Sequence, residues 1–342
     1  MDGVLGSASS NAPLRLSMKT SPQNTQSPSR LQLRIAAATA ALTTLWLPLP
    51  VHAEEKKPAP AAQASALSAE DREQIAAAAA VHEKAGGLYA RGKHAEAEAE
   101  YRAALAIRRR LLGAEHPDTL MNRTNLANSL RAQGKFAGIE AEYRAVLAVQ
   151  ERVLGAEHAD TLASRFNLAV TLDAWGKSAE AEAEHRAVLA IRERVLGTEH
   201  IDTNISQWAL ASLFHYNRKY SEAEAIYRRL IPFFERVRGA GDPETLRLRN
   251  LSALALQGLG KNAEASLEHR MVLAIREHTL GAEHPEVAKA CYNLARSLAY
   301  QKKLTEALPF AQRALAIREK VLGKEDPDTK TARRLVAGLE TE

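Results

Sequence analysis

The sequence has little of what several classes of protein need. Its single cysteine, Cys291, excludes an intramolecular disulfide and gives no support to a structural zinc cluster. Aromatic residues make up only 5% of the 342 residues, whereas Ala, Glu, Arg and Leu are abundant. This composition favours long helices over sheets.

The motifs of common enzymes are also missing. The sequence contains no GxSxG, HExxH or CxxC pattern. WGKS at residues 175–178 resembles the end of a phosphate-binding loop, but Thr171 stands where that loop needs glycine, and no strand is predicted before it. We therefore expect a protein that is not an enzyme, with no catalytic residue, no metal ligand and no cofactor.

The net charge is small once the N-terminus is set apart. Residues 1–53 carry four Lys or Arg and one Asp, which is +3 of the total +5, so the remainder is near +2. The later charges alternate in sign and form no basic stripe of the kind that a phosphate backbone requires. The sequence therefore does not predict nucleic-acid binding.

The first 53 residues differ in composition from the rest. Residues 1–29 are rich in Ser, Asn, Gln, Thr and Pro, and we expect them to be disordered. Arg30 and Arg34 then precede an apolar run of 15 residues, 35–49, which is shorter than the roughly 20 residues of a membrane-spanning helix. Val51 and Ala53 fit the cleavage site of an export signal.

We interpret residues 1–53 as a leader with a signal peptide that is cleaved near Ala53, which makes the mature protein periplasmic or secreted. The alternative is an uncleaved membrane anchor formed by residues 30–50. Met18 would give the signal a more ordinary start than Met1. Residues 54–69 form a linker rich in Pro and Ala.

A nine-residue segment recurs along the rest of the chain. LGAEHPDTL at 112–120 returns at 154–162, 196–204 and 280–288, with weaker copies at 238–246 and 322–330. The glycine of each copy follows the previous one by 42 residues. A second mark, usually Gly-Lys as at 92–93 and 134–135, keeps the same step. Each unit thus has two joints.

Between the joints the apolar residues follow helical spacing. In one unit, stripes over residues 119–132 and 136–154 predict two amphipathic helices, which can bury both stripes only by stacking on further copies. We predict an all-α superhelical solenoid over residues 70–342. It contains six 42-residue helix pairs and a capping helix over 329–340.

The small and aromatic residues of these helices resemble the tetratricopeptide repeat. Ala127 and Ala169 occupy the close-packing point of first helices, Ala181 and Ala223 that of second helices, and Tyr143 the bulky second-helix position. The 42-residue step and the LGxEHPDT joint resemble the kinesin light chain type, as in bacterial kinesin-light-chain-like proteins. No heptad segment precedes the repeats, so the resemblance does not extend to a motor subunit.

The recurring joint has the residue types of an active site but the order of a helix boundary. Gly113 suits a helix end, Pro117 the first turn of the next helix, and His116 the N-cap between them. The corresponding histidines lie one per repeat, too far apart to converge on a metal ion. We interpret the joint as structural.

The resemblance implies that first helices line a concave groove that binds a protein or an extended peptide. Asn125, Asn167 and Asn293 fall where such repeats bind a peptide backbone through amides. The alternative is that these are merely solvated helix residues. Further expected groove residues are Asn128, Arg131, Asn250, Arg296 and Arg334.

The fourth repeat departs from the pattern. Ala209 replaces the asparagine, and aromatic residues cluster around it. We expect Trp208 and Tyr216 to face the groove, with loss of Trp208 affecting partner affinity more than stability. Pro232 is expected to kink its helix or end it early.

Two binding functions follow from these observations. The first is an exported, non-catalytic scaffold or adaptor that binds a protein or peptide in the groove. The second follows from the resemblance, because bacterial proteins of this type are associated with bacterial tubulins: the chain would bind tubulin-type filaments and tether them to a membrane through residues 30–50. The export signal favours the first.

Overall fold

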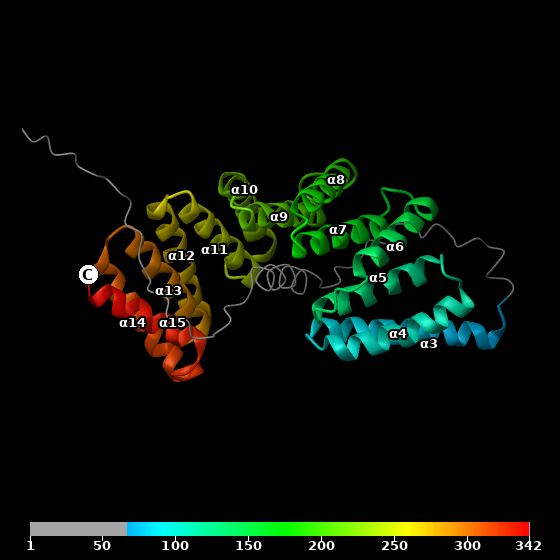
Figure 1. The fold of residues 1–342 in the computed structure, drawn as a ribbon, viewed down its shortest axis with the longest axis horizontal. Coiled ribbons are helices and arrows are strands. Elements are labelled where there is room, and N and C mark those ends of the chain that lie inside the picture. The colour runs from blue at the N-terminus through cyan, green and yellow to red at the C-terminus, as the bar shows by residue number, and fades with distance from the viewer. Residues whose placement is uncertain (1–66, 342) are drawn as a thin grey trace, which may run out of the picture.

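The computed structural model describes residues 67–341, and these form helices without strands. Six helix pairs and one last helix confirm the predicted solenoid (Figure 1). The pairs are α3 (Ala69–Ala90) with α4 (His94–Leu111), α5 (Pro117–Ala132) with α6 (Ile139–Val153), α7 (Ala159–Ala174) with α8 (Ser178–Leu196), α9 (Ile201–Tyr216) with α10 (Tyr220–Arg238), α11 (Pro243–Gly258) with α12 (Asn262–Leu280), and α13 (Pro285–Tyr300) with α14 (Leu304–Leu322), followed by α15 (Pro327–Glu340).

The recurring joint is a helix boundary, as expected. The Nδ1 atom of His116 accepts a hydrogen bond from the backbone N–H of Asp118 at 3.2 Å, and so caps α5. The same bond recurs at α7, α9 and α13, while Asp242 and Asp326 cap α11 and α15 through their carboxylates. The joint glycines have positive φ, such as 91° at Gly113, a conformation that few other residues adopt.

The glutamate of the joint connects one repeat to the next. Glu115 pairs with Arg152 at 2.6 Å, and Glu157 pairs with Arg194 at 2.6 Å, each 37 residues further along the chain. Glu199 and Arg236 form a third pair of this kind. The histidine and the glutamate of the segment therefore both have a role in holding the stack.

A buried arginine near the end of most second helices also ties each pair to the following first helix. Arg108 donates to the backbone carbonyl of Asp118 at 3.0 Å, and Arg192 donates to that of Asp202 at 3.1 Å. Arg276 and Arg318 repeat this contact. In the fourth repeat the position is taken by Phe234, so that joint is packed by an aromatic ring instead.

The core follows the predicted small and bulky positions. Ala127, Ala169 and Ala223 are almost fully buried, and Tyr143 is buried beside them. In the third and fifth repeats His185 and His269 replace this tyrosine. Burial lowers the pKa of each imidazole to about 4, with a smaller effect from nearby arginine, Arg192 in the case of His185.

Two local expectations need correction or refinement. Helix α6 begins at Ile139 rather than at residue 136, because Gly138 adopts a left-handed conformation (φ 78°) just before it. Pro232 does not end its helix early, since α10 continues to Arg238. Pro232 itself is exposed, and the helix beyond it is held by the buried rings of Phe233 and Phe234.

The helix pairs form an arch in which first helices lie on the inner side, with α7 and α9 below α8 and α10 in Figure 1. First helices also contact one another directly, α3 with α5, α5 with α7, α7 with α9 and α13 with α15. Each second helix packs between two first helices on the outer side. The described residues contain no helix long and apolar enough to cross a membrane; the expected signal or anchor lies outside them, as do the leader and most of the linker.

Candidate functional site

Helix geometry separates the inner face of each first helix from its core face. Successive residues of an α-helix are turned by about 100°, so a residue two positions before the buried alanine of the core points about 200° away from it. Asn167 stands in that relation to Ala169, and Asn293 to Ala295. These asparagines therefore lie on the inner face, opposite the second helix of their own repeat.

The aligned asparagines Asn125 and Asn167 differ in what they contact. Asn125 is buried, and its amide nitrogen lies 3.2 Å from Nε2 of His82 on the preceding first helix. Nδ1 of the same ring lies 3.0 Å from Oδ1 of Asn122, so both ring nitrogens have partners. Asn167 is half-buried, and its side chain makes no hydrogen bond to any described residue. Of the two, Asn167 alone presents a free amide.

In the middle of the inner face this contact between neighbouring first helices becomes apolar. Residues 43 apart meet there as His82 and Asn125 do at the end. Ala209 packs on the cluster of Phe166 and Val170, and Leu251 packs on the cluster that contains Trp208. In the fourth repeat Ala209 thus replaces the asparagine, and Phe166 stands 43 positions before it, where His82 stands before Asn125.

Trp208 lies in the core, which corrects the expectation that it faces the groove. It is 1% exposed, its ring meets Phe234 edge-on at 5.4 Å between centroids, and Arg247 covers it at 5.5 Å. The physical reason is that Phe234 of α10 stands where most second helices carry a buried arginine, so the indole ring has an apolar partner in the core. The rationale for Trp208 as a partner anchor is therefore wrong.

Arg334 has the same helical position in α15 as Trp208 in α9, yet it is exposed. No second helix follows α15 among the described residues, so nothing covers this side of the last helix. Arg334 therefore lies at the end of the stack rather than beside the other expected groove residues.

The other expected residues around the N-terminal half are tied into the fold. Oδ1 of Asn128 accepts a hydrogen bond from the hydroxyl of Tyr143 at 2.6 Å and lies 3.3 Å from Nη2 of Arg131. Arg131 is 3% exposed, so its guanidinium is not open to a partner. Tyr216 is partly buried, and burial raises the pKa of its hydroxyl.

At the C-terminal half the expected residues form one group. The amide nitrogen of Asn293 donates to Oδ1 of Asn250 at 2.8 Å, between α13 and α11. One turn further along α13, Arg296 lies between the rings of Tyr292 and Tyr300, 5.8 and 5.9 Å from their centroids. The structure thus brings Asn250, Asn293 and Arg296 together.

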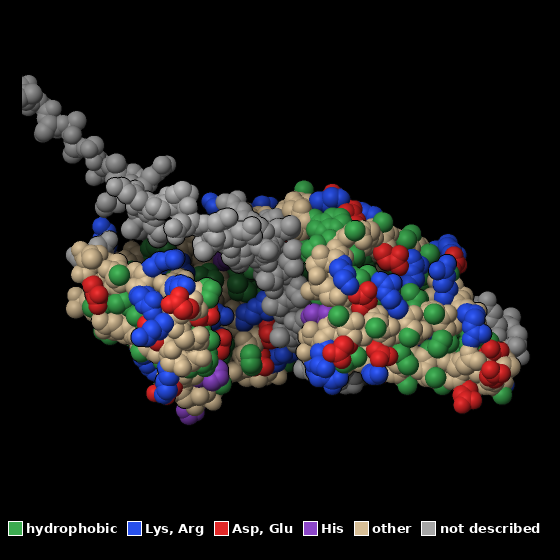
Figure 2. Space-filling view, turned by 60° about the horizontal axis from the view of Figure 1, so that its bottom comes forward, with side chains coloured by type: hydrophobic (Ala, Val, Ile, Leu, Met, Phe, Trp, Pro, Cys, Tyr) green, Lys and Arg blue, Asp and Glu red, His purple; other side chains and the backbone are tan. Residues whose placement is uncertain are grey.

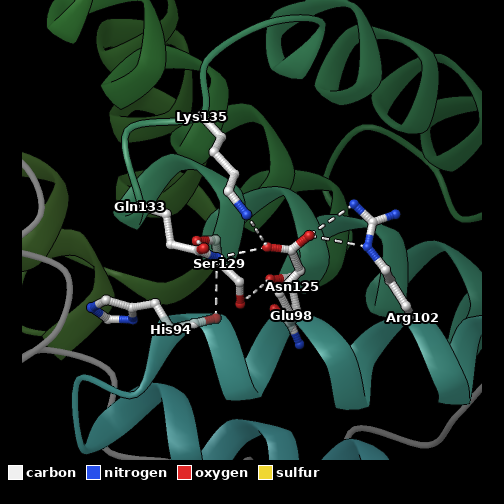
Figure 3. A network of polar contacts seen from close by, with 7 residues as sticks. All are labelled: His94, Glu98, Arg102, Asn125, Ser129, Gln133 and Lys135. Atoms are coloured by element: carbon white, nitrogen blue, oxygen red, sulfur yellow. Dashed lines mark hydrogen bonds and ion pairs between the residues drawn. The ribbon is translucent and has the colours of Figure 1, made fainter.

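A second polar network lies at the turn between α5 and α6 (Figure 3). Glu98 of α4 accepts from Lys135 at 2.8 Å, from Gln133 at 2.8 Å and from Arg102 at 2.9 Å. The hydrogen bond from Lys135 is the main reason that the pKa of Glu98 falls to about 2. The same carboxylate-to-lysine pair recurs between Glu140 and Lys177 and between Glu182 and Lys219, so this network links repeats.

On the face seen in Figure 2, Lys and Arg side chains are interspersed with Asp and Glu side chains over both halves of the molecule. In residues 67–341 no three side chains of His, Cys, Asp or Glu converge in a way that could hold a metal ion. The inner face, with the free amide of Asn167, an apolar middle and a stacked guanidinium, has the groups of a binding surface.

Comparison with known families agrees with this geometry. Models described as tetratricopeptide repeat match residues 76–141, 121–194 and 176–236, and a second such model matches 245–286 and 287–328. The chain belongs to the tetratricopeptide repeat family. No curated protein matches the sequence.

Several solved structures are similar to this one. Kinesin light chain TPR-like repeats from Podospora anserina are 29% identical, with a TM-score of 0.56, covering 60% of this chain and 98% of theirs. BtubC (BKLC) from P. vanneervenii is 21% identical, with a TM-score of 0.55, covering 76% of this chain and 95% of its own. The apo form of RapI is 13% identical, with a TM-score of 0.63, covering 77% and 71%. The last two likenesses concern the fold alone.

Sequence reasoning missed two residues of the inner face in this tetratricopeptide repeat chain, Tyr292 and Tyr300. The repeat step could have found the second, since Tyr300 stands two repeats, or 84 residues, after Tyr216. Tyr292 stands two repeats after Trp208 in the same way. Unlike Trp208, it is only partly buried, because Arg318 rather than a phenylalanine supports its ring.

Proposed function

We propose that this protein is a non-catalytic scaffold that binds an extended segment of a protein partner along the inner face of its first helices. The observation that carries the proposal is the state of Asn167, a half-buried amide on the inner face that bonds to no described residue. A carboxamide both donates and accepts, so it can pair with the backbone of an extended chain in both directions.

The neighbourhood of Asn167 supports this use. Ile205 and Ala209 on the next first helix are partly buried apolar residues beside Val170, and they offer a surface for an apolar side chain of the partner. The outer side is committed to the stack instead, because ion pairs such as Arg144 with Glu180 run from one second helix to the next. Asn167 and these apolar residues make the inner face the surface that we assign to the partner.

Site-specific photocrosslinking tests the proposal. A benzophenone amino acid replaces either Ala163, which is partly exposed on α7 one turn before Asn167, or Ala183, which is exposed on the outer helix α8. After irradiation in an extract of the source cells, we expect discrete adducts from position 163 and few from position 183. Equal adducts at both positions, or adducts only at 183, would contradict inner-face binding.

A tubulin-type filament is a second candidate partner. It rests on the resemblance of the joint and the 42-residue step to the kinesin light chain type, and the fold of BtubC is compatible with it. Co-sedimentation with polymerised bacterial tubulin tests this candidate. Binding that survives substitution of Asn167 would place a filament on another surface.

We further propose that the protein is exported, with an uncleaved membrane anchor as the alternative. The support is the charged, apolar and cleavable order of residues 30–53, which lie outside the described residues. A topology reporter fused after residue 66 tests it: activity outside the cytoplasm agrees with export, and this result would remove cytoplasmic filaments from the candidate partners.

A further inference from the structure

Arginine and tyrosine side chains alternate in a stack at the C-terminal end of the inner face. The guanidinium of Arg318 lies 4.8 Å from the ring centroid of Tyr292, Arg296 lies 5.8 Å from that centroid, and Arg296 lies 5.9 Å from the centroid of Tyr300. Arg318 is buried, whereas Tyr300 is 53% exposed. We call these four residues the Arg–Tyr stack; it runs from the core to the surface.

The Arg–Tyr stack contains two guanidinium groups and no carboxylate. Within residues 67–341, no Asp or Glu forms an ion pair with Arg296 or Arg318. Arg249 on α11 shows the usual arrangement in this fold, with Glu235 at 2.6 Å and Glu268 at 2.7 Å. Arg296 differs because, among the described residues, its guanidinium contacts the rings of Tyr292 and Tyr300 and no carboxylate.

The rings restrict how Arg296 can be used by a ligand. Two tyrosines lie near its guanidinium, a favourable contact for the cation that also limits its rotation. The N–H groups in the plane of the guanidinium make no hydrogen bond to any described residue. Such a planar, fixed set of donors matches the two oxygens of a carboxylate in a bidentate pair.

The amide pair beside the stack adds a second kind of contact. Asn293 precedes Arg296 by three residues and therefore lies next to it on α13. Its amide nitrogen is engaged by Asn250, but its own oxygen and the amide nitrogen of Asn250 bond to no described residue. The free acceptor and the free donor can pair with the backbone of a partner residue, while the guanidinium beside them binds the acidic side chain of that residue.

We propose that Arg296, held between Tyr292 and Tyr300, binds an Asp or Glu side chain of the partner segment. The inference rests on the proposed function and gives the partner a chemical character: an acidic residue at the end of the segment that lies over α11 and α13. The N-terminal half has no arginine at the equivalent positions of the repeat, where Asn128 and Val170 stand.

Selection from a random-peptide phage library tests the inference. The full-length chain and its Arg296→Gln variant are each used as bait, after circular dichroism has shown equal helicity. We expect peptides selected by the natural chain to be enriched in Asp and Glu, and peptides selected by the variant to lose that enrichment. Peptides without acidic enrichment from the natural chain would overturn this inference and leave the proposed function standing. No selected peptide from either bait would contradict both.

One selected acidic peptide then gives the size of the effect. We expect Arg296→Gln to weaken its binding about tenfold or more, as for the loss of a charge-assisted pair, and Arg296→Lys to weaken it by a smaller factor. Lys324→Gln removes an equal charge from an exposed joint and serves as the control. An equal loss in the Lys324 and Arg296 variants would mean that net charge alone attracts the peptide, which would overturn the site.

Discussion

The two ends of the inner face are built differently from its middle. At the ends, residues 43 apart join neighbouring first helices by polar contacts, His82 with Asn125 and Asn250 with Asn293. In the middle the same relation is apolar: Ala209 packs on the cluster of Phe166. The backbone repeats every 42 residues throughout, so the difference is made by side chains alone.

This difference shows that an asparagine on the inner face is not by itself a binding residue. Asn125 is used by the fold because His82 lies behind it. Asn167 has no such partner: the residue 43 positions before it is Thr124, whose hydroxyl lies 3.1 Å from that of Ser164. The residue one repeat earlier therefore decides whether an inner-face amide serves stability or recognition.

Truncation of the apolar middle should have the largest effect. Trp208→Ala removes a ring that is 1% exposed, and we expect the free energy of unfolding to fall by about 3–5 kcal/mol. Urea denaturation followed by circular dichroism measures it. Trp175→Ala, at a half-buried turn position, should have a smaller effect. A stable Trp208→Ala chain that no longer binds its partner would restore the original view of Trp208 as an anchor.

Acid should weaken the middle through His185, whose ring meets that of Phe166 edge-on at 5.4 Å. Burial lowers the pKa of His185 to about 4, so the folded chain keeps it neutral while the unfolded chain takes up a proton below about pH 6.5. Its contribution is therefore complete above that pH and is lost between about pH 6.5 and 4, by about 3 kcal/mol.

His185→Tyr tests this pH dependence, because it restores the residue found at Tyr101 and Tyr143. Unfolding by urea at pH 7 and pH 5 should show a smaller loss for the variant than for the natural chain. Both the natural chain and the variant retain some acid sensitivity through His269, whose pKa is also lowered to about 4. Identical pH profiles for the two chains would mean that His185 can be protonated in the fold.

The aligned asparagines should separate stability from binding. Asn125→Ala leaves the buried ring of His82 without one partner, and we expect a loss of about 1–3 kcal/mol in unfolding free energy. Asn167→Ala should change stability by less than about 0.5 kcal/mol and weaken partner binding instead. The two variants are each other's control in denaturation and in affinity measurements. Equal stability losses would show that Asn167 also has a structural partner.

The solenoid could be predicted from the sequence because its repeat is visible six times. The position of the joints, the histidine caps and the small residues all follow from local helix chemistry at a constant step. The inner face could be predicted only in part. A step of 42 aligns Asn125 with Asn167, but their roles differ because His82 bonds to Asn125 whereas Thr124, at the same separation from Asn167, bonds to Ser164.

The error at Trp208 has the same origin. Aromatic residues cluster in the fourth repeat, and the position of Trp208 in the repeat indicated the groove, whereas the ring that packs on it comes from another helix. Counting from Ala211 places Trp208 toward the second helix, where Phe234 replaces the buried arginine of other repeats. The aromatic pair is thus a local change of core chemistry, and it could have been predicted by comparing positions 208 and 234 together.

Replacing the apolar contact in the middle of the inner face by the polar contact found at its ends should have the smallest effect of these changes. It is also the sharpest test of whether the ends and the middle are built on the same contact. Phe166→His and Ala209→Asn together would copy His82 and Asn125 into the middle, at the same separation of 43 residues. Each single variant should destabilise the chain, because a polar group is buried in an apolar contact without a partner. In the double variant the new hydrogen bond should recover about 1 kcal/mol relative to the sum of the single changes.

A double-mutant cycle by urea denaturation measures this coupling. Strictly additive effects would mean that positions 166 and 209 do not contact each other. The polar contacts at the ends and the apolar contact in the middle would then not be two versions of one contact between first helices.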